Sequence, residues 1–440
     1  MAESPAAADA AAPPRRALRM LVICYLFLGA LYLSKLPPGS GPDETAHVRY
    51  VEYLAQHHRL PVFDHTHPGP DYEFHQPPLY YTLCLPSYLL AARDPAAAAQ
   101  AVRFFSLLVS VALLYLTFAL GRAIAPDRPW AALAAAGIVA FLPMRLYLSA
   151  CIGNDGLTEV WVAAALLVMI YHLRAAARHR AGETPRPAGL SGMIATGLLI
   201  GLGVMTKSLA ILLLPAAWLT AAFSARGPDR YQWRWLARDV AVVTGLVLVV
   251  AGWWLLRNQH LYGDPLAQQA FLSGFEGRSP SPQDMLHRFG LTHFSYLIWV
   301  VGWTAASFTG VFGPRFEVFL PRQVYLVTGL VSLVGGVAFA RYLTKAGLSA
   351  WQRQAWWLCA LVGALMVAAF VRFNISFFQA QARYIFPGLL PAAALAFSLG
   401  VEDLAPARLK RALPLAVPIG LALLSSVGLL LWILPQLEAP

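Results

Sequence analysis

The chain of 440 residues is 58% hydrophobic and 12% charged, about half the charged fraction of a soluble domain. Apolar runs of about 20 residues recur along it, and each is long enough to cross a hydrocarbon layer of about 30 Å. The composition predicts an all-α polytopic membrane protein and excludes a soluble enzyme. A membrane barrel would instead show alternating polarity.

The net charge of +11 does not indicate nucleic acid as a partner, because the basic residues cluster in short loops beside apolar runs. Such clusters mark the cytoplasmic side of a membrane protein. They lie at 174–186, 226–238, 341–353 and 408–411. The segment 37–76 instead holds six acids against Arg49 and Arg59, so we expect it on the extracytoplasmic side.

In chain order, residues 1–17 are predicted to form a cytoplasmic tail, followed by about eleven membrane crossings. Two further apolar stretches lie at 77–92 and 291–313. All of the basic loops are cytoplasmic only if neither stretch crosses the membrane. If both cross, the count rises to thirteen. The predicted spans are 18–36, 103–121, 130–149, 156–173, 192–207, 208–223, 239–256, 322–341, 354–372, 384–401 and 413–434.

This topology divides the chain into two transmembrane modules. The N-terminal module, 18–256, carries the large first extracytoplasmic loop, 37–102. The C-terminal module, 257–440, carries the extracytoplasmic loop 257–290. The outer face then collects these two loops with residues 151–155, Lys207 and the segment 372–383, and polar residues of unusual type concentrate there.

Asp43 and Glu44 lie just beyond the first predicted span and open a segment, 45–58, whose Val48, Val51, Leu54 and Ala55 share one helical face. The pattern predicts an amphipathic helix in the membrane interface. Helix punctuation would explain one acid well and two acids less well, but not His47. Two acids with His47 one turn further indicate chemistry, and a carboxylate here can act as a general base.

A divalent metal is a second interpretation of the same loop. Glu44 and His47 are one helical turn apart, and Asp43, His47 and His75 are candidate ligands, with Glu73 as a further one. The zinc-protease motif, however, needs a histidine where Asp43 stands. No cofactor is therefore assigned, and a divalent metal stays open.

The loop closes on His75-Gln76-Pro77-Pro78-Leu79-Tyr80-Tyr81. An aromatic belt explains Tyr80 and Tyr81, whereas His75 and Gln76 suit recognition of sugar hydroxyls. Further on, Asn154 and Asp155 fit either a helix cap or a binding role. Lys207 is a single ammonium between two apolar runs, which indicates either snorkelling or a phosphate site.

Arginine is unusual on the outer face, yet Arg257 ends one span there and Arg383 opens another. Together with Lys207 they indicate an anionic ligand at the membrane surface. The remaining candidates for substrate binding are their neighbours, Asn258, Tyr262 and Tyr384.

In their order along residues 18–401, these motifs resemble the GT-C glycosyltransferases, and the most similar group is the bacterial family-39-like, protein-mannosyltransferase type. The strings that carry the resemblance are Asp43-Glu44-x-x-His47, His75 to Tyr81, Asn154-Asp155, Gly201 to Lys207, Arg257-Asn258 with Tyr262-Gly263-Asp264-Pro265, and Arg383-Tyr384-x-x-Pro387. The histidine-rich stretch 57–67 has no place in this pattern.

The resemblance implies the GT-C fold, with interfacial helices in the first outer loop and a catalytic carboxylate. It also implies inverting transfer of a hexose or pentose from a polyprenyl-phosphate donor to a glycan, lipid or protein. Carried over, Asp43 is the base, with Glu44 beside it. The expected location is the bacterial plasma membrane, among its lipids, with an extracytoplasmic site.

Two functions of other classes stay open. A lipid-linked substrate transporter or flippase predicts charges at mid-span or broken helices in two related halves. A membrane metallohydrolase built on Asp43, His47 and His75 predicts loss of activity on chelation.

Overall fold

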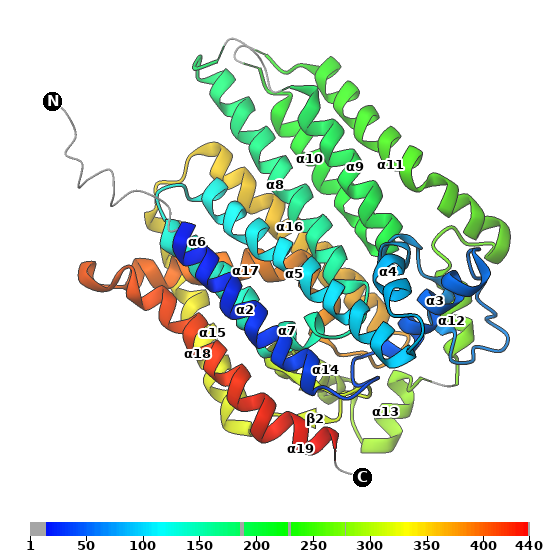
Figure 1. Ribbon diagram of the computed structural model, residues 1–440. Coiled ribbons are helices and arrows are strands. Elements are labelled where there is room, and N and C mark those ends of the chain that lie inside the picture. Colours follow the sequence, from blue (N-terminus) through cyan, green and yellow to red (C-terminus); the bar gives the residue numbers. More distant parts are fainter. Residues whose placement is uncertain (1–14, 185–188, 228–229, 278, 439–440) are drawn as a thin grey trace.

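The computed structural model describes residues 15–184, 189–227, 230–277 and 279–438. Most of the predicted cytoplasmic tail (residues 1–14) and Arg186 of one basic loop lie outside this part. The described chain is a bundle of long helices with shorter helices gathered at one end (Figure 1). The predicted all-α polytopic architecture is confirmed, since the strands amount to one two-stranded hairpin.

Helices make up nearly the whole order of elements, and the hairpin falls in the second half of the chain. From the N-terminus the elements are α2 (Arg15–Lys35), α3 (Glu44–His57), η1 (Tyr72–His75), α4 (Leu79–Leu90), α5 (Pro95–Ile124), α6 (Pro129–Phe141), α7 (Pro143–Ser149), α8 (Asp155–Arg180), α9 (Leu190–Thr206), η2 (Ser208–Leu213), α10 (Leu214–Ser224), α11 (Trp233–Tyr262), α12 (Gln268–Phe275), α13 (Pro282–Phe289), α14 (His293–Thr309), β1 (Val311–Phe312), β2 (Val318–Phe319), α15 (Arg322–Lys345), α16 (Ala350–Asn374), η3 (Ala382–Tyr384), α17 (Phe386–Leu404), η4 (Ala407–Leu409), α18 (Ala412–Gly428), the π-helical turn η5 (Leu429–Ile433) and α19 (Leu434–Leu437).

Each predicted span coincides with a helix or with a pair of consecutive helices. By length and composition, seven helices in the described chain can cross a membrane, or eight if α6 and α7, bent by 63° at Pro143, count as one span. Proline causes the bend, because it lacks the N–H for the helical ladder. The shorter apolar α9, the η2–α10 pair and α17 account for the other three predicted spans.

Small residues bring the long helices close together. A Cβ added at Gly201 of α9 would lie 2.7 Å from Val250 Cβ of α11, and one at Gly400 of α17 would lie 2.5 Å from the backbone N of Phe339 in α15. Helices in lipid associate largely through such close packing. One hydrophobic core runs through both halves of the chain, from Tyr25 of α2 to Ile433 of η5.

The two ambiguous apolar stretches differ from the spans. Helix α4 has 12 residues, which give about 18 Å at 1.5 Å per residue, too short for the hydrocarbon layer. Both halves of α14 touch one loop: Tyr296 donates to the Asn374 carbonyl (3.3 Å), and Ser307 Oγ accepts from Ala382 N–H (2.8 Å). Both ends of α14 therefore stay at one end of the bundle.

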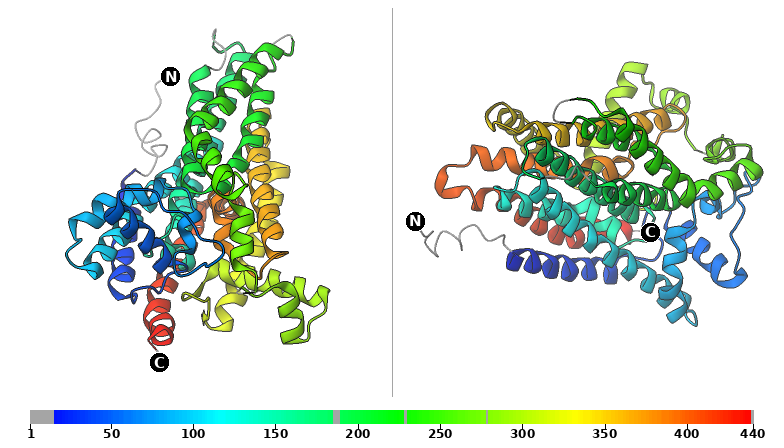
Figure 2. Two further views of the ribbon diagram at one scale, coloured as in Figure 1. Left: turned by 90° about the vertical axis from the view of Figure 1, so that its right-hand side faces the viewer. Right: turned by 90° about the horizontal axis from the view of Figure 1, so that it is seen from above.

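The amphipathic helix predicted at 45–58 is confirmed as α3. Its apolar face, which includes Val51 and Leu54, packs onto α4, and the two helices share a small aromatic core that is separate from the main one. Helices α3, α4 and α12 lie together beside the ends of the long helices, as two views show (Figures 1 and 2). This group forms one wall of the candidate active site.

Candidate active site

A cavity of about 370 Å³ opens at this end of the bundle, between the first loop, η2, α12, α16 and η3. Polar groups share its lining with an apolar side. The polar lining includes Asp43, His47, Glu73, His75, Gln76, Asn154, Lys207, Arg372, Arg383 and Tyr384. The apolar lining includes Leu209, Ile211, Leu212, Leu266, Phe271, Met366, Phe370 and Phe373.

Asp43 stands at the first position before α3 with a left-handed backbone (φ 58°). Its side chain makes no capping hydrogen bond, so this carboxylate does not act as a side-chain cap of α3. Asp43 Oδ2 accepts from Arg383 (2.5 Å) and Oδ1 accepts from the Tyr72 hydroxyl (3.0 Å). Burial opposes ionisation, but the charges of Arg383 and His47 and the hydrogen bonds from Arg383 and Tyr72 together outweigh it and lower the pKa of Asp43. The side chain keeps 30% of its surface exposed, so an ionised carboxylate faces the cavity.

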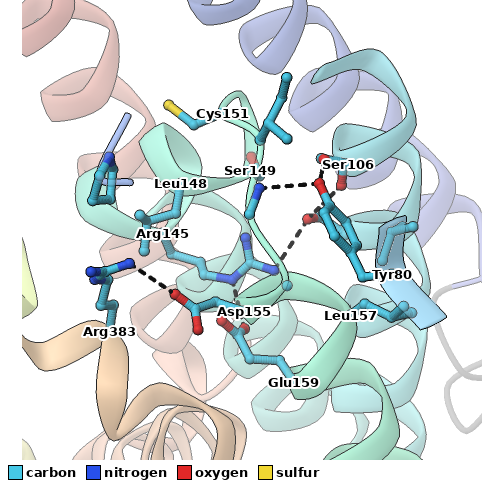
Figure 3. A pocket seen from close by; sticks show the side chains of 16 residues that line it. Tyr80, Ser106, Arg145, Leu148, Ser149, Cys151, Asp155, Leu157, Glu159 and Arg383 are labelled. Atoms are coloured by element: carbon cyan, nitrogen blue, oxygen red, sulfur yellow. Dashed lines mark hydrogen bonds and ion pairs between the residues drawn. The ribbon is translucent and has the colours of Figure 1, made fainter. Parts of the chain in front are cut away.

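Arg383 links this carboxylate to a second acid from a distant part of the chain. Its Nη1 donates to Asp155 Oδ2 (3.4 Å), and Asp155 Oδ1 pairs with Lys207 Nζ. Figure 3 shows Arg383 pointing at Asp155 from η3. Lys207 and Arg383 both lie within cation–π distance of the Tyr384 ring. Two predicted cations and two predicted acids thus form one chain of alternating charge along the cavity.

A buried ion pair lies behind Asp155. Arg145 of α7 donates to Glu159 Oε2 of α8 (2.7 Å), and the two side chains are 3% and 1% exposed. Arg145 also donates to Ser110 of α5 (3.2 Å), so the pair ties three helices together (Figure 3). Because Glu159 lies one helical turn after Asp155, the pair fixes the end of α8 that carries Asp155.

Glu44 points away from the cavity. Arg103 of α5 donates to both of its carboxylate oxygens (2.7 Å each), and the backbone N–H groups of Gly41 and Ile152 donate as well (3.0 Å each). Both side chains are 2% exposed. Glu44 therefore anchors the start of the first loop to α5 and to the turn before α8.

His47 lines the cavity and is paired with the fully buried Tyr81, with Nδ1 of His47 2.8 Å from the Tyr81 hydroxyl. Tyr81 in turn stacks on Tyr50, with ring centroids 3.8 Å apart. Glu73 of η1 lies beside His47, at 4.0 Å between Oε2 and Nδ1. Burial raises the pKa of Glu73.

His75, Gln76 and Asn154 form a hydrogen-bonded row. His75 Nδ1 donates to the Tyr72 carbonyl (2.7 Å), Gln76 Nε2 donates to His75 Nε2 (3.2 Å), and Asn154 Nδ2 donates to Gln76 Oε1 (3.3 Å). Burial lowers the pKa of His75 to about 4. Asn154 occupies the N-cap position of α8, but its side chain makes no capping hydrogen bond.

The remaining predicted residues do not reach the cavity. Tyr80 bonds Ser106 (2.8 Å) and faces a small space lined by Arg145 (Figure 3). Arg257 donates to the Pro61 carbonyl (2.6 Å) and Asn258 to the Pro265 carbonyl (3.1 Å), while the Tyr262 hydroxyl accepts from Phe63 N–H (2.9 Å). The Arg257 and Tyr262 contacts join α11 to the first loop, and Asn258 secures the turn after α11.

The donor set does not fit a metal ion. Among the described residues, no three histidines, cysteines or acids are grouped so that they could hold one. Both Asp43 oxygens accept hydrogen bonds, His75 Nδ1 donates to a carbonyl, and His47 Nδ1 bonds Tyr81. These side chains are therefore considered for acid–base and binding roles.

Several residues at or beside the cavity were missing from the predicted site. Tyr72 bonds Asp43, Glu73 lies beside His47, and Arg372 adds a cation at the rim. Arg372 lies in the segment 372–383, which was expected on the outer face, but it was not predicted as a site residue. Glu73 was considered only as a candidate metal ligand. The anchors Arg103 and Arg145 had a usable signal, since an ionisable residue inside an apolar span is costly.

The helical arrangement is that of the GT-C membrane glycosyltransferases. The oligosaccharyltransferase of Archaeoglobus fulgidus, in complex with Zn and sulfate, matches with a TM-score of 0.55 and 15% identity, over 93% of this chain and 52% of that one. ArnT from Cupriavidus metallidurans matches in its apo state (TM-score 0.52, 17% identity) and bound to undecaprenyl phosphate (0.50, 16%), over 95% of this chain and 73% of that one in both cases. The chain thus spans about half the length of the archaeal enzyme.

The predicted GT-C fold is therefore confirmed, and the apolar helices make this an integral, multi-pass membrane protein. The family described as dolichyl-phosphate-mannose-protein mannosyltransferase matches residues 77–254, which confirms the predicted resemblance to the protein-mannosyltransferase type. The matched stretch holds Asn154, Asp155 and Lys207, but begins after Asp43 and ends before Arg383. No curated protein sequence matches the chain.

Proposed function

We propose that this protein transfers a hexose or pentose from a polyprenyl-phosphate donor to an acceptor hydroxyl on the extracytoplasmic face, with inversion. One observation carries the proposal: a single cavity is lined by an ionised carboxylate, Asp43, by the cations Lys207 and Arg372 and by an apolar wall. An amphiphilic phosphodiester with a sugar head fits these three surfaces. ArnT, which shares the fold, has been solved with undecaprenyl phosphate.

In the proposed reaction the acceptor oxygen attacks the anomeric carbon while the bond from that carbon to the phosphate oxygen breaks. Asp43 takes the proton of the acceptor hydroxyl as a general base. The polyprenyl phosphate leaves with the bonding electron pair. Tyr72 and Arg383 orient the carboxylate. The acceptor oxygen attacks the anomeric carbon from the side opposite the leaving phosphate, so the configuration at that carbon is inverted.

The developing charge on the leaving phosphate is greatest in the transition state, where cations already in place help most. Lys207 is paired with Asp155, and Arg383 with two carboxylates. Arg372 donates to Ser376 (3.2 Å) and forms no ion pair with an acid of the described chain. We therefore assign the first phosphate contact to Arg372 and Lys207. Arg257, expected there from sequence, lies outside the cavity.

The residues that do not line the cavity take other roles in the proposal. Glu44, with Arg103, positions the start of α3, which Asp43 immediately precedes. Arg257, Asn258 and Tyr262 hold the two outer loops in place. The row of His75, Gln76 and Asn154 faces the cavity and offers polar groups for sugar hydroxyls.

The test uses purified protein in lipid nanodiscs with undecaprenyl phosphate carrying radiolabelled mannose or arabinose. Washed membranes supply glycan, lipid and protein acceptors, and the fraction that becomes labelled identifies the acceptor class. We expect release of undecaprenyl phosphate and a labelled acceptor with one of these donors. A folded protein that binds undecaprenyl phosphate but turns over neither donor would favour transport and overturn the proposal.

A further inference from the structure

Glu73 differs from the other carboxylates near the cavity. Asp43 accepts from Tyr72 and Arg383, Asp155 pairs with Lys207 and Arg383, and Glu44 accepts four hydrogen bonds. Glu73 is 6% exposed, and its Oε2 has no hydrogen-bond partner in the described chain. Its hydrogen-bonding capacity is left unused inside the protein.

The nearest polar neighbour does not satisfy this carboxyl group. His47 Nδ1 lies 4.0 Å from Glu73 Oε2, beyond hydrogen-bonding distance, and is already bonded to Tyr81. A buried polar group without a partner destabilises the fold, because it gives up its hydrogen bonds to water and gains none in the protein. Such a group at the wall of a ligand-sized cavity is expected to be satisfied by the ligand.

The position of Glu73 indicates which part of the ligand it meets. It lines the same cavity as Asp43 and Lys207, and its ionisation is influenced by Asp43, Lys207 and Arg383. The acceptor oxygen must reach Asp43, and the phosphate must reach the cations. The group that fills the space between them is the sugar.

We propose that Glu73 binds a hydroxyl group of the transferred sugar and so distinguishes sugar-bearing lipid from bare polyprenyl phosphate. This inference rests on the function proposed above. A carboxyl group can accept from a hydroxyl when ionised and can also donate to one when protonated. The buried surroundings raise the pKa of Glu73 and so favour the protonated carboxyl group, which can both donate and accept.

The experiment compares binding of two probes, undecaprenyl phosphate and undecaprenyl phosphate mannose, to wild type, Glu73→Gln and Glu73→Ala in nanodiscs. We expect the Kd of the bare lipid to change less than twofold and the Kd of the sugar lipid to rise about tenfold in Glu73→Ala, with a smaller rise in Glu73→Gln. Tenfold corresponds to the loss of one hydrogen bond at the upper end of the usual range. Glu52→Gln is the control, since Glu52 lies on α3 and outside the cavity, where it accepts from Tyr88 (3.4 Å).

Monodeoxy analogues of the mannose lipid identify the contact without relying on a variant. One analogue should bind wild type about tenfold more weakly yet bind Glu73→Ala no more weakly than the full sugar does, as a double-mutant cycle requires. If Glu73→Ala raises the Kd of both lipids equally, or changes neither Kd, Glu73 does not bind the sugar. That result would leave the proposed function standing. Failure of wild type to bind even undecaprenyl phosphate would overturn the proposed function as well.

Discussion

Asp43→Asn separates catalysis from architecture at this site. The amide keeps the shape of the side chain and can still accept from Tyr72, which lies 3.0 Å from Oδ1, but it cannot take a proton from an acceptor. Loss of a positioned general base reduces the rate by about 10²–10⁴-fold, or about 3–5 kcal/mol in activation free energy. We expect a fall in kcat of that size with little change in donor Kd.

The expected effect on folding is smaller, because Arg383 keeps other partners. Asp155 Oδ2 remains at 3.4 Å from its Nη1 and Gln381 Oε1 at 2.7 Å from its Nε. The guanidinium is therefore not left unpaired, and we expect a loss of about 1–2 kcal/mol in the free energy of unfolding. Thermal unfolding in nanodiscs measures this alongside release of undecaprenyl phosphate.

The matched control is Asp71→Asn. Asp71 belongs to the same loop and pairs with Arg49, but both side chains are more than 40% exposed, and surface pairs contribute about 0–1 kcal/mol. We expect activity within twofold of wild type. If Asp43→Asn itself keeps activity within threefold of wild type, Asp43 is not the base and the mechanism is refuted.

The other predictions concern a buried pair, a histidine and a rim arginine. Glu44→Gln should lower the free energy of unfolding by about 3–5 kcal/mol, because Arg103 keeps its buried charge without an acid; a variant as stable as wild type in thermal unfolding would contradict this. The pKa of His75 is lowered to about 4, so its contribution to stability is fully present above pH 6.5 and is lost as pH falls towards 4, by up to about 3 kcal/mol. His75→Gln should flatten stability against pH in that window, and an unchanged slope would count against a buried neutral histidine. Arg372→Gln should raise the Kd of undecaprenyl phosphate about fivefold, a modest figure because the side chain is exposed, whereas Lys345→Gln, at the far end of α15, should leave that Kd unchanged; equal effects of the two would remove Arg372 from the phosphate site.

The sequence predicted the elements and the end of the bundle where the site lies. Apolar runs and basic loops were sufficient to locate the helices and to group the first loop, residues 151–155, Lys207 and 372–383 at one end. The periodicity of 45–58 located α3. These features are local, and the physics behind them, burial length and charge next to lipid, acts along the chain.

Pairing between distant residues was not predictable in the same way. Arg383 meets Asp43 across 340 positions, and nothing in either motif specifies that contact. Arg257 and Arg383 have equivalent local settings, yet one bonds the Pro61 carbonyl and the other bonds Asp43. Only packing of the loops decides between them. Glu44 was grouped with Asp43 because they are adjacent, whereas successive helical positions point in different directions.

The left-handed backbone at Asp43 limits which amino acids can occupy the position at all. Glycine, asparagine and aspartate adopt it readily, and other L-residues are strained by about 1–2 kcal/mol. Of the three that fit, aspartate alone carries a carboxylate, so glutamate is disfavoured here by main-chain geometry even though its chemistry would serve. Alanine at this position would combine backbone strain with loss of the carboxylate. Glycine removes the same side chain without that strain, which makes Asp43→Gly the cleaner deletion.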